Sequence, residues 1–281
     1  MRWKGRQGSA NVEDRRSISG GKVAAGGGIG ILAVAVIVWL LGGNPNEIID
    51  TLQSTGGVQN AADPAVIKAE EELAQFVSVV LKDTEDIWRV LFSHMGETYR
   101  EPTLVLFSGS AQSACGYSSS ATGPFYCPGD ERVYIDLSFL AELQRRLGAT
   151  GDFAMAYIIA HEVGHHVQKQ LGILDRVQGM RGRVGEAEFN ENQVKLELQA
   201  DFLAGIWAHY AQKTKDILEE GDVDEAVNAA AAVGDDRIQM QSQGYVVPDS
   251  FTHGTSEQRK AWFLKGFRTG DLNQGNTFAR R

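Results

Sequence analysis

The segment His161-Glu162-Val163-Gly164-His165-His166-Val167-Gln168 decides the fold, because it carries the pattern H-E-x-x-H within a run of helical periodicity. Residues four apart lie on one face of a helix, so both outer imidazoles of the pattern can reach one ion while Glu162 faces a water molecule beside it. Apolar residues dominate the positions around the motif. Buried His and Glu side chains need a partner that offsets their desolvation. The segment therefore predicts a metal site, with zinc as the expected ion.

A catalytic zinc site needs a third protein ligand and one open position. A histidine six residues after His165 is excluded, since Leu171 stands there. The alternative is a glutamate on a later helix, followed one turn on by an acid that holds a zinc-binding histidine through its second ring nitrogen. Among the glutamates of residues 186–197, only Glu197 has such an acid, Asp201. The sequence therefore predicts His161, His165 and Glu197 as the ligands and Asp201 as their support.

Further motifs accompany these residues: Gly123-Pro124-Phe125-Tyr126-Cys127-Pro128, Val133-Tyr134-Ile135-Asp136-Leu137, Met1-Arg2-Trp3-Lys4-Gly5-Arg6 and Asn11-Val12-Glu13-Asp14-Arg15-Arg16. With the histidine motif and Glu197-Leu198-Gln199-Ala200-Asp201, they resemble the bacterial neutral zinc metallopeptidase family over nearly the whole chain. The resemblance implies a membrane-anchored peptidase of gluzincin type with Zn²⁺ as its cofactor. It implies a peptide or protein substrate without naming one.

Zinc held by these ligands would activate water for attack on a peptide carbonyl, with Glu162 as the general base. The oxyanion that forms needs a second donor. Three side chains are candidates for this donor: His253, Arg259 and Tyr245. His253 directly precedes an expected capping box, Thr255 to Gln258, at the entrance of a helix. We therefore expect His253 to be catalytic.

The remaining patterns predict a mainly helical α+β domain with a small sheet over residues 63–281. The resemblance implies that this domain has a zincin-like fold. Apolar residues at helical spacing predict helices over 65–95, 138–147, 152–171, 186–213, 222–243 and 255–268. Residues 103–107 and 132–137 are the convincing strands. Val133 to Leu137 is the expected sheet edge on which a peptide substrate adds a strand.

Residues 23–41 contain no charged side chain, and as a helix they would be roughly 28 Å long, close to the ~30 Å hydrocarbon thickness of a membrane. The segment has no polar face, which a core helix would show. It also lacks the pattern of small residues at which a signal peptide is cleaved. All six Lys and Arg of the first 43 residues precede it, and such charges stay on the cytoplasmic side. The sequence predicts a single-pass protein of the bacterial cytoplasmic membrane: a basic cytoplasmic tail at 1–22, the anchor at 23–41, a flexible stalk at 42–62 and a periplasmic or extracellular domain at 63–281.

Cys115 and Cys127 bracket a loop rich in Gly, Ser and Pro. In an oxidising compartment such a pair is expected to form a disulfide. Two free thiols are the alternative.

The formal net charge of -9 argues against general nucleic-acid binding, which needs clustered Lys and Arg. The leading expectation is a zinc metalloendopeptidase. The alternative is a catalytically inactive, zinc-stabilised binding or scaffold module of the cell envelope. Three ligands with a glutamate beside one histidine favour catalysis, because structural zinc normally has four protein ligands. The sequence indicates no oligomeric state.

Overall fold

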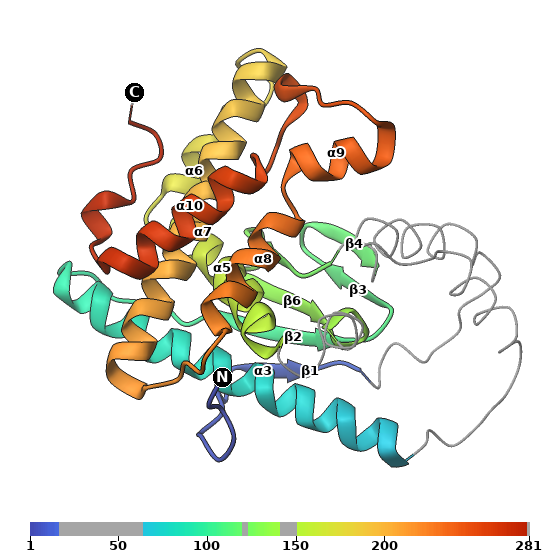
Figure 1. Ribbon diagram of the computed structural model, residues 1–281, viewed down its shortest axis with the longest axis vertical. Helices are drawn as coiled ribbons and strands as arrows, with labels where there is room; N and C mark the ends of the chain where they lie inside the picture. Colours follow the sequence, from blue (N-terminus) through green and yellow to red (C-terminus); the bar gives the residue numbers. More distant parts are fainter. Residues whose placement is uncertain (17–63, 120–122, 141–150, 280–281) are drawn as a thin grey trace, which may run out of the picture.

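A four-stranded sheet lies beside a stack of helices in the structure, a computed structural model that describes residues 1–16, 64–119, 123–140 and 151–279 (Figure 1). The strand order is β1-β2-β6-β5. The strands are β1 (Val12–Asp14), β2 (Thr103–Phe107), β5 (Phe125–Cys127) and β6 (Arg132–Asp136). β1, β2 and β6 are parallel, whereas β5 runs antiparallel to β6. β2 and β6 confirm the two predicted strands. β6 pairs with β2 over its whole length and with β5 from Arg132 to Tyr134. The prediction that Val133 to Leu137 forms a sheet edge is therefore wrong at Val133 and Tyr134.

Helices make up most of the remaining described chain, so the predicted α+β class is confirmed. They are α3 (Pro64–His94), α5 (Asp152–Gln170), α6 (Ile173–Gln178), α7 (Glu186–Lys215), α8 (Asp222–Ala232), α9 (Asp235–Gln243) and α10 (Ser256–Thr269), with short 3-10 turns η2 (Pro248–Ser250) and η3 (Leu272–Gln274). The predicted helices over 65–95, 152–171, 186–213 and 255–268 are confirmed. The expected helix over 138–147 falls largely outside the described residues.

Glycines allow the helices to approach closely where the core requires it. A Cβ at Gly205 of α7 would lie 2.1 Å from the carbonyl oxygen of Phe263 in α10, and one at Gly266 of α10 would lie 2.1 Å from that of Phe202. Real Cβ atoms are not found at such separations, so these two helices cross at a distance that only glycine permits. This crossing brings the buried faces of α7 and α10 into direct contact.

The predicted helix over 222–243 is broken in the structure. Gly234 is extended, with φ -72° and ψ 137°, and separates α8 from α9. A Cβ at Gly234 would lie 2.4 Å from the backbone nitrogen of Ser256. The helical pattern therefore stops where the chain touches α10, and a new helix begins at Asp235.

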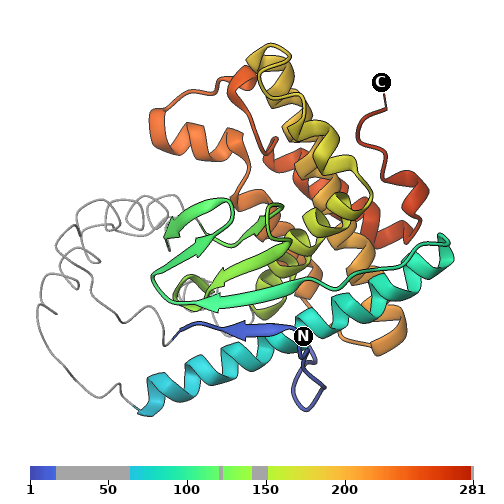
Figure 2. The ribbon, with the colours of Figure 1, turned by 180° about the vertical axis from the view of Figure 1, so that it is seen from behind.

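The first sixteen residues are packed into the folded unit instead of forming a separate tail. β1 pairs with β2 and lies along α3, as the reverse view shows (Figure 2). Met1 and Trp3 belong to the hydrophobic core. The sequence prediction placed residues 1–22 in a tail and began the domain at residue 63, whereas residues 1–16 are structural parts of that domain.

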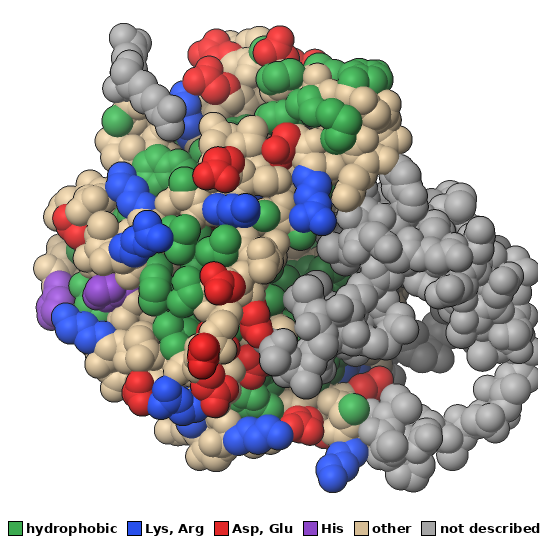
Figure 3. Space-filling view, viewed as in Figure 1, with side chains coloured by type: hydrophobic (Ala, Val, Ile, Leu, Met, Phe, Trp, Pro, Cys, Tyr) green, Lys and Arg blue, Asp and Glu red, His purple; other side chains and the backbone are tan. Residues whose placement is uncertain are grey.

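No helix within the described ranges is long and apolar enough to cross a membrane. The predicted anchor at 23–41 and stalk at 42–62 lie outside those ranges. Acidic and basic side chains are interspersed on the face shown in Figure 3. The described residues of this face therefore form no continuous basic surface of the kind that nucleic-acid binding needs.

The predicted disulfide is confirmed. Cys115 and Cys127 are bonded, with their Cα atoms 5.8 Å apart. Cys115 lies in the turn of a hairpin formed by β3 (Ser110–Ser113) and β4 (Gly116–Ser119), and Cys127 ends β5. The bond therefore fixes the outer strand of the sheet to this hairpin.

Candidate metal centre

α5 carries the histidine motif on the face that meets α7. His161 and Glu162 are buried, and His165 is nearly so. Gly164 allows the approach of the two helices, because a Cβ there would lie 3.1 Å from the carbonyl oxygen of Ala200. The small residue inside the H-E-x-x-H pattern therefore brings the motif against the middle of α7.

The three predicted ligands converge between these helices. His161 Nε2 lies 3.1 Å from Glu197 Oε2, and His165 Nε2 lies 3.5 Å from Glu197 Oε1. One ligand atom from each of the three residues falls within 4.8 Å of the others. Two imidazoles and one carboxylate are a donor set found in catalytic zinc sites. The chemistry of these residues therefore fits zinc.

Asp201 holds the second ring nitrogen of His161, as predicted. Its Oδ1 lies 2.8 Å from His161 Nδ1, and Tyr157 donates its hydroxyl to the same oxygen. Burial disfavours the imidazolium, but the charges and hydrogen bonds of Asp201 and Glu197 outweigh it and raise the pKa of His161 to about 10. The pKa of Asp201 falls to about 2, because Arg259 and His161 outweigh the effect of burial. The metal-free site thus holds a proton where a metal would bind.

Gln168 supports the other histidine. Its Oε1 lies 2.9 Å from His165 Nδ1, and its Nε2 donates to the carbonyl oxygen of Leu196 at 2.7 Å. The side chain is fully buried. Because both Nδ1 atoms are engaged, both Nε2 atoms are left to face Glu197. This role of Gln168 was not predicted, although its place three residues after His165, one helical turn on, is the signal that indicates it.

Glu162 lies beneath β5, the outer strand of the sheet. Burial raises the pKa of its carboxyl group, while the nearby His161 and His165 and a hydrogen bond from the backbone of Tyr126 partly oppose that rise. Tyr126 lies at the centre of β5. The expected general base is therefore close to a sheet edge.

His253 lies in a loop that Asp235 organises. The Oδ2 atom of Asp235 accepts the backbone N–H groups of Thr252, His253 and Gly254 at 2.6 to 2.9 Å, and its Oδ1 lies 3.2 Å from His253 Nδ1. This hydrogen bond raises the pKa of His253, with Glu197 contributing in the same direction. Among the described residues, the hydrogen-bond partners of this half-exposed ring, Asp235 and Thr252, both lie at Nδ1. Asp235 was not predicted, because nothing in the local sequence links it to a loop 17 residues away.

The loop lies directly over the ligand-bearing part of α7. A Cβ at Gly254 would lie 3.1 Å from Val194 and 3.3 Å from Leu198, which flank Glu197. The structure therefore packs the His253 loop against the turn of α7 that carries Glu197, and the charge of Glu197 acts on the His253 ring.

The other two candidates for the oxyanion donor have different surroundings. Arg259 is buried and donates from Nε to Asp201 Oδ2 at 2.8 Å and from Nη2 to Oδ1 at 2.9 Å. Tyr245 is 60% exposed in the loop after α9. The prediction of Arg259 as a donor to substrate is not supported, because its donors face Asp201.

His166, next in sequence to a predicted ligand, packs against neighbouring segments instead. Its Nδ1 lies 3.1 Å from Tyr126 Oη and its Nε2 lies 2.6 Å from the carbonyl oxygen of Arg100.

A second group of carboxylates, Asp152, Asp222 and Glu225, also comes within metal-binding distance. The amino group of Met1 lies 2.6 Å from Asp152 and 3.4 Å from Asp222. Glu225 accepts the backbone N–H of Phe153 at 3.1 Å. These acids thus already have a cationic partner from the chain itself.

The chain is similar in sequence to other bacterial proteins. The chain is 48% identical to the Escherichia coli K12 protein YpfJ over 286 residues, which covers 100% of this chain and 99% of that protein. It is 38% identical to the Mycobacterium tuberculosis H37Rv protein Rv2575 over 253 residues, which covers 85% of this chain and 84% of that protein. No solved structure matches the chain.

The family described as "Putative neutral zinc metallopeptidase" matches residues 1–278, a range that includes β1, the histidine motif and the His253 loop. With the three ligands converging on one point between α5 and α7, this match places the chain in that metallopeptidase family.

Proposed function

We propose that the protein is a zinc-dependent endopeptidase of zincin-like fold. The observation that carries the proposal is the convergence of His161, His165 and Glu197 within 4.8 Å, with Glu162 on the same helix as the two histidines. A bound zinc ion would supply a Lewis acid that makes water nucleophilic near neutral pH and polarises a peptide carbonyl. All three ligands are supplied by two rigid helices, as a preorganised site requires.

Glu162 moves the proton in this proposal. It accepts a proton from the attacking water and returns it to the leaving amine. Burial raises the pKa of this carboxyl, which makes its carboxylate a stronger base than an exposed glutamate.

His253 donates to the oxyanion through Nε2, because its Nδ1 faces Asp235. Asp235 orients the ring and favours its protonated form. In this proposal Glu162 transfers the proton, and His253 stabilises the negative charge of the oxyanion.

We propose that the substrate backbone binds along β5 in place of the initially expected β6. β5 is an outer strand, and its residue Tyr126 contacts Glu162 through the backbone. An extended peptide paired with this edge would run past the general base. The bond between Cys127 and Cys115 holds the edge in place and supports a location of the domain outside the cytoplasm.

The direct test uses the purified full chain, a broad peptide library and measured metal content. We expect cleavage inside peptides, loss of cleavage on removal of the metal with a chelator, and recovery with one equivalent of zinc. Cleavage that persists in metal-free protein would contradict the proposal. Bound zinc with no cleavage of any peptide in the library would favour a zinc-stabilised binding module.

A further inference from the structure

We infer that residues 1–16 lie on the same side of any membrane as residues 64–281, so that the chain cannot cross a membrane once between them. The sequence prediction placed these two parts on opposite sides of an anchor at 23–41. The packing of the N-terminal segment, defined here as residues 1–16, is the observation that carries the inference.

The backbone of this segment completes the sheet. β1 pairs with β2 in parallel, with Val12 opposite Leu104 and Asp14 opposite Leu106. The ladder continues on both sides, since Leu104 donates to the carbonyl oxygen of Asn11 and Arg15 donates to that of Leu106, each at 2.8 Å. β2 is buried along four of its five residues. Removing β1 would leave the backbone groups of a buried strand without partners.

Apolar side chains from the segment fill the core against α3. Trp3 is 8% exposed and its ring lies edge-on to Phe76, with 5.4 Å between the centroids. Ser9 donates from its backbone nitrogen to the carbonyl oxygen of Ser78 at 2.9 Å. A Cβ at Gly8 would lie 2.4 Å from Ser78 Oγ and 3.2 Å from Ser78 Cβ, so a side chain at position 8 would displace Ser78 from its place against the segment.

The segment also partners acids that α3 buries. Asp83 and Glu85 are 1% and 2% exposed. Arg6 forms an ion pair with Asp83, and the side chains of Ser9 and Asn11 donate to Glu85. A buried carboxylate is costly unless it is paired and hydrogen-bonded. The buried acids of α3 therefore depend on the N-terminal segment for their partners, and the two must fold in one compartment.

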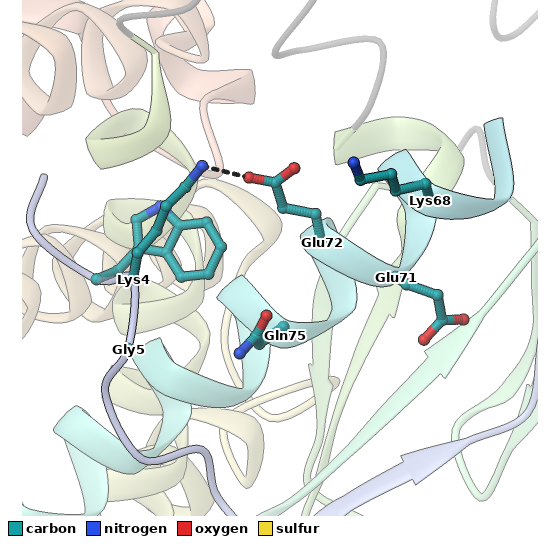
Figure 4. A pocket seen from close by; sticks show the side chains of 7 residues that line it. Lys4, Gly5, Lys68, Glu71, Glu72 and Gln75 are labelled. Atoms are coloured by element: carbon teal, nitrogen blue, oxygen red, sulfur yellow. Dashed lines mark ion pairs between the residues drawn. The ribbon is translucent and has the colours of Figure 1, made fainter. Parts of the chain in front are cut away.

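The described chain leaves and re-enters the domain at neighbouring points. Arg16 ends the N-terminal segment and its Nη2 lies 2.9 Å from Oε1 of Glu71, in the second turn of α3. Nearer the N-terminus, Lys4 pairs with Glu72 across a shallow hollow between the segment and α3 (Figure 4). Both ends of the intervening sequence are thus fixed to one face of the domain.

A single crossing at residues 23–41 would separate these ends by the ~30 Å hydrocarbon layer of a membrane. A return crossing would need a second apolar stretch, but residues 42–63 contain Glu47, Asp50 and Asp63 among many Gly, Asn and Gln residues. The intervening sequence therefore begins and ends on one side. The basic residues before position 23 then no longer set the orientation of the domain.

Accessibility of two engineered thiols in the full chain tests this inference. Lys4→Cys places a thiol on the N-terminal segment and Glu257→Cys places one on α10; both native side chains are exposed. The native cysteines do not interfere, because they are bonded to each other. Each variant is labelled with a membrane-impermeant maleimide, once in intact bacterial spheroplasts and once after permeabilisation. The ratio of the label in intact spheroplasts to the label in permeabilised ones is measured for each thiol.

We expect the two ratios to be equal, whether the thiols are both reached from outside or both protected. Labelling of only one of the two thiols in intact spheroplasts, with the other labelled only after permeabilisation, would overturn the inference.

Proximity provides a second readout. Arg16→Cys combined with Glu71→Cys should be joined within one chain by a short bis-maleimide, whereas Arg16→Cys combined with Glu257→Cys should not. If Arg16→Cys and Glu71→Cys are not cross-linked although both thiols are free in the purified protein, the packing of the N-terminal segment on α3 is contradicted.

Discussion

The guanidinium of Arg259 donates two hydrogen bonds to the carboxylate of Asp201, from Nε to Oδ2 at 2.8 Å and from Nη2 to Oδ1 at 2.9 Å. The same Oδ1 lies 2.8 Å from Nδ1 of His161. Arg259 therefore acts on the proposed zinc site through Asp201, and the crossing of α7 and α10 at Gly205 and Gly266 holds the two residues together.

Replacing Arg259 should weaken zinc binding. Arg259→Met leaves Asp201 with fewer donors and His161 less firmly oriented, and loss of such outer partners costs 10- to 100-fold in metal affinity, roughly. Competition with a zinc chelator measures the change. Arg268→Met, on the exposed end of α10, is the control and should bind zinc like the wild type. Equal affinities in the two variants would show that Arg259 does not position the ligand.

Zinc affinity should rise with pH. In the metal-free protein His161 keeps its proton up to a pKa of about 10, so zinc must displace that proton at neutral pH. Displacement of one proton predicts an affinity about tenfold higher per pH unit below that pKa. Asp201→Asn removes the main charge that favours the imidazolium of His161. In this variant the zinc affinity should therefore rise less steeply with pH between pH 7 and 9. An affinity that does not change with pH would contradict the protonated site.

The pair of His253 and Asp235 should set the alkaline side of the pH profile. Asp235 raises the pKa of His253, so the imidazolium is present below that raised value and is lost as the pH rises through it. Activity that needs the charged ring is lost over the same range. In Asp235→Asn the loss should begin at lower pH, toward the ordinary histidine value of about 6.5. An unchanged profile of kcat/KM against pH in this variant would remove His253 from the mechanism.

The glycine crossing should be essential for stability. In Gly205→Ala the added methyl group meets Phe263 and Phe267 backbone atoms at 2.1 and 2.7 Å, so α7 and α10 must separate. Such overpacking should lower the free energy of unfolding by roughly 3 kcal/mol. Gly185→Ala is the matched control, because nothing lies within 4 Å of a Cβ there. Urea unfolding of both variants measures the difference, and equal stabilities would refute the tight crossing.

Local patterns predicted the ligands because each depends on spacing within one helix. The histidines are four residues apart in α5, and Glu197 and Asp201 are four apart in α7, so helical periodicity alone puts each pair on one face. The long amphipathic helix α3 was predicted for the same reason.

Contacts between distant segments could not be predicted in this way. β1 is three residues long, includes Glu13 and Asp14, and pairs with a strand about 90 positions later. Its alternation is too short to identify a strand, so the segment was assigned to a basic tail. Asp235 was missed because its role depends on the helix break at Gly234, which is caused by contact with Ser256. β5 is only three residues long, which is too short for its pattern to identify a strand, so the pairing of β5 with β6 could not be predicted.

The most direct test of the central claim is the Glu162→Gln variant of the full chain, measured for zinc content and peptide cleavage together. The variant keeps all three ligands and replaces the proposed base by an amide of the same shape. We predict about one zinc per chain in wild type and variant alike, with kcat/KM lower by roughly 10²- to 10⁴-fold. Glu188→Gln, on the exposed start of α7, should cleave like the wild type. Undiminished cleavage by Glu162→Gln with zinc bound would contradict the proposed role of Glu162 and, with it, the mechanism.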